Sequence, residues 1–189
     1  FTKFTEVEMA DFDQKQIDQF AENWFRVRGL PEKTVPFREK LRANPTVLEL
    51  ASSPLLLTML CLVFEGRTDL DGSRAELYDK GLDVLLNKWD GTRGIARDWP
   101  YEAMNTAQRR ALLSEIAYTQ FRQGAIFFRD QVLEKQIASY FEERPNLLPD
   151  GQSVDARQVL KAIEAQHGLL VERAQNIYSF SHLTFQEYL

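Results

Sequence analysis

The segment from Pro54 to Phe64 limits the fold more than any other, because it leaves no polar face when it is placed on a helix. A helix that is apolar on every side has to be buried among other elements. The segment is shorter than the roughly 18 to 20 residues that a membrane span needs, so it indicates the core of a helical bundle. Pro54 fits the first position of this helix, where a missing N–H group costs nothing.

The residues around this segment predict further helices in the first half of the chain. Asp13 is placed as an N-cap, and Gln16 follows it at the spacing of a capping box. Gly29 and Pro31 end this first helix. The apolar residues Ile17, Phe20, Ala21, Trp24 and Val27 follow the cap at helical spacing. The other helices expected in this half cover Lys33–Ala43, Thr46–Leu50 and a segment with the stripe Tyr78, Leu82, Leu85 and Trp89.

Two stretches suggest how the chain is divided. Phe1–Met9 alternates apolar and polar residues like a strand, but no partner strand lies nearby in the sequence. We therefore expect its sheet to belong to an upstream part, and the chain to be an internal fragment of a longer protein. Gly91–Pro100 is rich in Gly, Arg and Asp and indicates the main internal boundary.

The second half of the chain has a different order of elements. Thr106 and Asp130 are expected to cap two helices, with a short strand at Ala125–Phe128 between them. A third helix ends at Gly168, and Leu169–Arg173 with Ile177–Ser181 form a hairpin. The residues expected to face inward are Leu112, Leu113, Ile116, Ala117, Phe121, Leu133, Ile137, Tyr140, Phe141, Val159, Leu160 and Ile163. Helix, short strand, helix, helix and hairpin is the order of a winged helix. The fold class is therefore mostly α, with a small helical bundle followed by a winged-helix domain whose wing is a β-hairpin.

Several classes of chemistry have no support in this sequence. No glycine is followed by lysine, so a phosphate-binding P-loop cannot be present, and no strand ends in paired acids that could hold Mg²⁺. One cysteine and two distant histidines give no spacing for a metal site. No G-x-S-x-G motif occurs either. We predict no catalytic residue and no metal ligand in this chain. The single thiol, Cys61, lies in the apolar segment and fits a buried residue in a reducing cytoplasm.

The last twelve residues, Tyr178–Leu189, run from an alternating strand straight into a helix. His182 stands at the junction. Backbone amides at a helix N-terminus and an adjacent imidazole together suit a phosphate group. For Thr184 and Gln186 we expect roles in capping and bracing the helix rather than in binding a ligand.

This terminal segment, Phe180-Ser-His-Leu-Thr-Phe-Gln-Glu-Tyr188, resembles the one that closes the winged-helix part of NACHT ATPases. Ser52-Ser-Pro-Leu-Leu-Leu-Thr-Met-Leu60 resembles the proline-led helix of the same family, and both stand in the expected order. The resemblance implies three regions: residues 1–12 as the last strand and linker of an upstream ATPase core, 13–98 as a helical domain, and 99–189 as the winged-helix domain. NACHT proteins are signalling ATPases that switch between ADP-bound and ATP-bound states.

Carried over by position, the resemblance implies that Pro54 packs near the adenine and that His182 reaches the terminal phosphate of ADP. ADP or ATP would be held mainly by the P-loop core upstream in the same chain, which would also hold Mg²⁺. The chain would then be a regulatory module and not an enzyme itself, while its parent protein would be an ATPase. A downstream sensor and self-association on activation are the further partners implied. Ser53 departs from the family, which often has Gly or Asn before the proline.

Two other functions remain open at the level of sequence. A winged helix can bind nucleic acid, but the net charge is −5 and the candidate recognition helix, Asp155–Gln166, balances its bases with acids. A scaffold that has lost nucleotide control would share the fold and would lack only the upstream P-loop. No stretch is long enough for a membrane span, so we expect a cytoplasmic protein without membrane or nucleic-acid partners.

Overall fold

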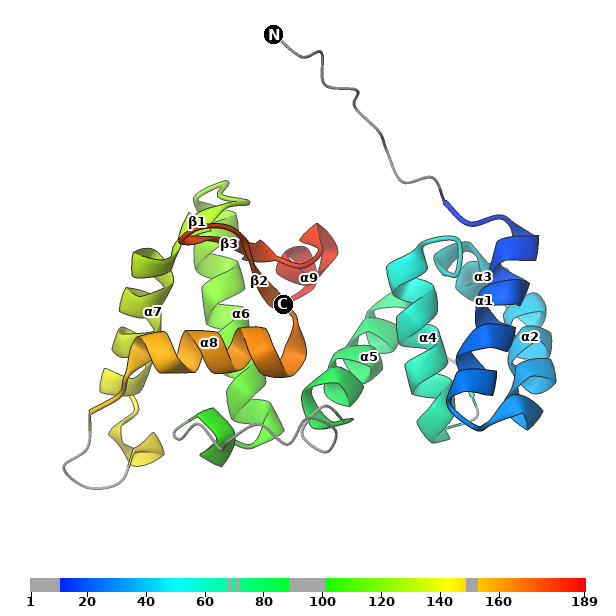
Figure 1. The fold of residues 1–189 in the computed structure, drawn as a ribbon, viewed down its shortest axis with the longest axis horizontal. Helices are drawn as coiled ribbons and strands as arrows, with labels where there is room; N and C mark the ends of the chain where they lie inside the picture. Colours follow the sequence, from blue (N-terminus) through cyan, green and yellow to red (C-terminus); the bar gives the residue numbers. More distant parts are fainter. Residues whose placement is uncertain (1–10, 68, 71, 89–100, 149–152) are drawn as a thin grey trace, which may run out of the picture. The chain divides into compact units, whose positions relative to one another are not determined.

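The computed structural model of this chain describes residues 11–67, 69–70, 72–88, 101–148 and 153–189 (Figure 1). The expected strand Phe1–Met9, the expected stripe residue Trp89 and the whole of the expected boundary Gly91–Pro100 lie outside these residues. The chain divides into two compact units between Val84 and Leu85.

The first unit is built from helices, most of them at the positions that the sequence predicts. They are α1 (Gln14–Val27), η1 (Pro31–Lys33), α2 (Thr34–Ala43), α3 (Pro45–Leu50), α4 (Pro54–Arg67) and α5 (Arg74–Lys88), the last of which crosses the division between the units. The predicted capping box is confirmed: the Asp13 carboxylate accepts from the Gln16 amide at 2.8 Å, and the Gln16 side chain accepts from the Asp13 amide at 2.9 Å. Pro54 is the first residue of α4, as predicted.

Three phenylalanines from different helices form the centre of this unit. The rings of Phe25 on α1 and Phe64 on α4 each meet the ring of Phe37 on α2 with centroids 5.3 Å apart. All three side chains are fully buried, and each pair is tilted edge to face. This is the geometry that aromatic rings prefer. The apolar segment that begins at Pro54 therefore has the buried position that its composition requires.

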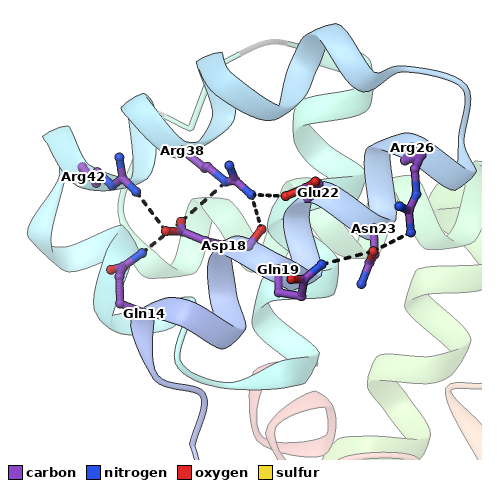
Figure 2. Close-up of polar contacts among 8 residues, drawn as sticks. All are labelled: Gln14, Asp18, Gln19, Glu22, Asn23, Arg26, Arg38 and Arg42. Carbon is purple, nitrogen blue, oxygen red and sulfur yellow. Dashed lines mark hydrogen bonds and ion pairs between the residues drawn. The ribbon is translucent and has the colours of Figure 1, made fainter.

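A network of ion pairs joins the outer faces of α1 and α2 (Figure 2). Asp18 lies between two arginines, with Arg42 Nη2 at 2.9 Å and Arg38 Nε at 3.6 Å from its carboxylate oxygens. Arg38 also donates to the Asp18 carbonyl at 2.6 Å and meets Glu22 at 3.0 Å. Because these groups are partly exposed, each pair adds little stability by itself. Their main effect is to fix how the two helices are aligned over the phenylalanine core.

The second unit has the element order of a winged helix. Its elements are η3 (Tyr101–Ala103), α6 (Thr106–Arg122), β1 (Phe128–Arg129), α7 (Asp130–Glu142), η4 (Pro145–Leu147), α8 (Ala156–His167), β2 (Leu170–Ala174), β3 (Ile177–Phe180) and α9 (Leu183–Tyr188). The sheet is antiparallel with β3 in the middle. This strand pairs with β2 in the wing hairpin on one side and with β1 on the other. The predicted fold class, mostly α with a winged-helix domain, is confirmed.

Most residues predicted to face inward in this unit are buried, and three helices share the core. The buried set is Leu112, Leu113, Ile116 and Ala117 on α6, Leu133, Ile137, Tyr140 and Phe141 on α7, and Val159, Leu160 and Ile163 on α8. Gly168 ends α8 in the left-handed conformation (φ 59°), which glycine adopts without strain. Asn176 takes the same conformation in the hairpin turn (φ 60°), where Asn is tolerated.

Four details predicted from the sequence are wrong. Phe121 is 56% exposed instead of buried. The strand predicted at Ala125–Phe128 lies at Phe128–Arg129, where it pairs with β3. The cap of α6 is Asn105 and not Thr106, because Asn105 forms the capping box with Gln108. Asp130 is the first residue of α7 rather than its cap.

Candidate functional site

His182 is the N-cap of α9 and lies at the end of the central strand of the sheet. Its Nδ1 atom accepts from the Thr184 amide at 3.3 Å and contacts the Thr184 hydroxyl at 2.5 Å. The imidazole thus occupies one of the amides at the start of α9. The cap is therefore His182 and not Thr184, which provides the amide that is capped. The side chain itself is exposed.

The amide contact makes Nδ1 the acceptor in one tautomer of His182, and the neutral ring in that tautomer has its proton on Nε2. Nε2 has no hydrogen-bond partner in the part of the chain that the structure describes. An exposed N–H group of this kind can donate to an oxygen of an anion, and a phosphate oxygen is a suitable acceptor.

The junction that carries His182 is held from two sides. On the sheet side, the Ser181 amide donates to the Leu169 carbonyl at 2.8 Å. The Arg173 guanidinium donates to the Ser181 carbonyl at 2.8 Å and, through Nε, to the Ser179 hydroxyl at 2.9 Å. Arg173 was not predicted as a site residue, and its partners lie six to eight residues away across the hairpin. It acts on His182 by fixing the backbone just before it.

On the helix side, α9 packs on α6 through the buried side chain of Phe185. Gln186 is also buried, and its Nε2 donates to the Ala125 carbonyl at 2.8 Å. The expectation that Gln186 braces the helix is thus confirmed, although its partner is 61 residues away and could not be read from the sequence. His182 therefore stands between a junction held by Arg173 and a helix held by Gln186.

Pro54, the second predicted site residue, belongs to the first unit and is half-buried. Its carbonyl accepts from the Thr58 hydroxyl at 2.9 Å, and the Ser53 carbonyl accepts from the Leu57 amide at 2.9 Å. The Ser52 carbonyl accepts from the Phe12 amide at 2.7 Å, so the proline turn lies beside the start of the described chain. Pro54 belongs to the first unit and His182 to the second.

The basic residues of α8 are paired with acids. Lys161 Nζ lies 3.0 Å from Glu164 on the same helix and 2.9 Å from Glu172 on the wing, and it stands over the ring of Tyr178 at 5.4 Å. These contacts raise the pKa of Lys161. Arg157 meets Glu134 of α7 at 4.0 Å. The lysine thus fastens the wing to α8, and its charge is already neutralised inside the domain.

We expect this attachment of the wing to weaken in acid. The contact with Lys161 and the hydrogen bond from the Asn176 amide lower the pKa of Glu172 below its ordinary 4.5. A carboxyl whose pKa is lower in the folded state than in the unfolded state adds to the free energy of unfolding at pH values above its unfolded pKa. This contribution is lost as the pH falls through the pKa of the folded state. The measurement is an NMR titration of the Asn176 amide, with a midpoint expected below pH 4.5. The Glu172→Gln variant is the control and should show no such transition; a midpoint at or above 4.5 in the wild type would contradict the prediction.

Other kinds of site find no support in the described part of the chain. No group of three or more His, Cys, Asp or Glu side chains there could hold a metal ion. None of the helices described is both long and apolar enough to pass through a bilayer. Cys61 is buried as predicted, and burial raises the pKa of its thiol. A thiol in that state is a weak nucleophile.

Comparison with known families agrees with this architecture. The family model of the winged helix-turn-helix domain C-terminal to NACHT matches residues 74–189, which is more than half of the chain. The chain therefore belongs to this family of NACHT-associated winged-helix domains. Its description places a NACHT domain upstream of the winged helix. Searches of curated proteins and of solved structures each gave no significant match.

Proposed function

We propose that this chain is the regulatory module of a NACHT-type signalling ATPase and that it closes over a nucleotide held by the upstream domain. The observation that carries the proposal is the position of His182 at the N-cap of α9, where its exposed imidazole can present an Nε2–H group beside the start of the helix. That group would donate a hydrogen bond to the terminal phosphate of ADP. The nucleotide and its Mg²⁺ would be bound chiefly by the P-loop of the upstream NACHT domain, which would also carry any ATPase activity.

The proline turn gives secondary support to this proposal. The hydrogen bond from the Phe12 amide to the Ser52 carbonyl joins the start of the described residues to the turn before α4. Pro54 is half-buried there, and its ring is a rigid apolar edge that suits the face or edge of an adenine. We propose Pro54 as a contact of the base and His182 as a contact of the phosphate. The helical domain, 13–98, and the winged-helix domain, 99–189, would move relative to the NACHT domain when ATP replaces ADP.

The energy of the proposed phosphate contact suits a switch. A hydrogen bond to a charged group contributes about 1.5–3 kcal/mol. A difference of that size between two states shifts their ratio by roughly ten- to a hundredfold. Opening of the closed state would then permit self-association, and a downstream sensor domain would bias the same equilibrium. We place the protein in the cytoplasm, whose reducing conditions suit its single buried thiol.

No observation favours the nucleic-acid alternative. Arg157 and Lys161 are the bases of the helix that would enter the major groove, and both are engaged by carboxylates. Phosphate contacts from unpaired Lys and Arg supply most of the affinity of nucleic-acid binding. The scaffold alternative has the same fold and differs from our proposal only in that no nucleotide controls the protein.

The test is to purify the full-length chain, release any bound nucleotide by denaturation and identify it by chromatography. We expect ADP, in an amount close to one per chain. Absence of nucleotide after purification, together with no binding of added ADP or ATP by calorimetry, would refute the switch and support the scaffold.

A further inference from the structure

Four of the eight exposed large hydrophobic side chains in the described residues lie in one short segment of the second unit. The full set is Val27, Val35, Tyr118, Phe121, Ile126, Phe127, Val132 and Leu183. Tyr118 and Phe121 lie in the last turns of α6, and Ile126 and Phe127 follow in the connection to β1. Side chains three apart on a helix share a face. We call residues 118–129 the aromatic turn.

Hydrogen bonds join parts of the aromatic turn to one another and to α7. Gly124 takes φ 65° and donates to the Phe121 carbonyl at 2.9 Å, and the Ala125 amide donates to the Gln120 carbonyl at 3.0 Å. The Gln120 side chain is buried and donates to Gln136 on α7 at 2.9 Å. Phe127 is nevertheless 63% exposed and Ile126 is 50% exposed. Large apolar side chains that are exposed close together indicate a surface that another protein covers.

The charge of the aromatic turn is of one sign. Its ionisable residues are Arg122 and Arg129, and it contains no acid. Arg122 stands over the ring of Tyr118 at 5.7 Å. Neither arginine forms an ion pair within the ranges that the structure describes, in contrast to Arg157 and Lys161 of α8. Tyr, Phe and Arg are enriched in the centres of protein interfaces, and the positive charge of the two arginines favours an acidic surface opposite them.

The small area of this surface limits the kind of partner that can cover it. The exposed apolar side chains present on the order of a few hundred Å², whereas stable complexes between separate chains bury roughly 800 Å² on each partner. A patch of this size is sufficient when its partner is part of the same chain, because the link between them provides a high effective concentration. The aromatic turn is also bonded to α9 through Ala125 and Gln186, and α9 begins at His182.

We infer that the aromatic turn is a docking surface for an acidic, apolar patch on the NACHT domain upstream in the same chain. The identity of the partner rests on the proposed function, since a domain that presents ADP to His182 has to approach α9. The docking contact itself is separate from the phosphate contact. It would hold the two domains together through side chains that do not touch nucleotide.

The test uses the full-length chain with the photoreactive residue benzoylphenylalanine in place of Phe127. Because Phe127 is an exposed aromatic residue, this replacement leaves the fold intact. After irradiation in the presence of ADP, mass spectrometry should map the crosslink to acidic and apolar segments of the NACHT domain in the same molecule. The matched control carries the probe at Val35, which is 60% exposed in the first unit, and should not label those segments.

A second measurement examines the energetic role of the aromatic turn. In the Phe121→Ser/Phe127→Ser variant, amide exchange in the crosslinked NACHT segments should rise by about tenfold or more. It should stay unchanged in Val27→Ser/Val35→Ser. Crosslinks only to a second copy, to residues 11–88 or to no protein segment would overturn the inference. The nucleotide content reports on the proposed function separately, so crosslinks to the NACHT domain in a chain without nucleotide would support docking and refute the switch.

Discussion

Replacing His182 by alanine is expected to weaken retention of ADP by the full-length chain by roughly ten- to a hundredfold. The alanine variant removes two interactions at once, however. It deletes the Nε2–H donor, and it also deletes the Nδ1 acceptor that caps the Thr184 amide. Loss of an N-cap costs about 1 kcal/mol, so part of any effect could come from a weakened α9.

The His182→Asn variant separates the two roles of the imidazole. Asparagine is among the best N-cap residues, so its side-chain oxygen can accept from the Thr184 amide in place of Nδ1. Its side chain is too short to place a donor where Nε2 lies. We therefore expect the asparagine variant to keep the stability of the wild type and to lose ADP as the alanine variant does.

The readouts are the nucleotide retained after purification and the midpoint of denaturant unfolding, for wild type, His182→Ala and His182→Asn. If only the alanine variant loses ADP, His182 acts through the cap alone. If all three chains retain ADP equally, His182 is a structural residue of the junction and the proposed phosphate contact is wrong.

Local signals in the sequence were sufficient for most helix boundaries. Asp13 with Gln16 and Gly168 each predicted a terminus that the structure has. The same rule would have corrected the cap of α6, because Gln108 stands three residues after Asn105, whereas Arg109 stands three residues after Thr106. Capping depends on neighbouring residues and is therefore readable from sequence.

The errors arose where burial depends on distant residues. Periodicity placed Phe121 inside and could not show that Gln120, the polar residue before it, is buried by pairing with Gln136. The position of β1 depends on pairing of Phe128 with Tyr178, fifty residues further along the chain. For the candidate site, the sequence located His182 at a strand–helix junction. It could not reveal the contact of the ring with Thr184 or the supports from Arg173 and Gln186, because these are three-dimensional contacts.

The largest effect on stability is expected from Phe37→Ala. Phe37 is fully buried and contacts the rings of both Phe25 and Phe64, so truncation leaves a cavity where three helices meet. Substitutions of this kind cost about 3–5 kcal/mol, which is a large part of the roughly 5–15 kcal/mol that holds a typical domain together. Val35→Ala on the same helix is the matched control. Val35 is exposed, so its truncation should change the free energy of unfolding by less than about 0.5 kcal/mol.

For Phe37→Ala, the helices that lose amide protection matter as much as the size of the loss in stability. The structure divides at Val84, within α5, and the family match begins ten residues earlier at Arg74. If the helical unit and the winged helix are separate bodies, Phe37→Ala should abolish amide protection in α1, α2 and α4 and leave that of α6 and α8 intact. Hydrogen exchange resolved by segment measures both. Equal loss of protection in all five helices would mean that the units unfold as one body, and a hinge between them could not serve as the moving part of a switch. Loss confined to the first unit would show that each can move as an independent domain, as nucleotide-dependent closure over the NACHT domain requires.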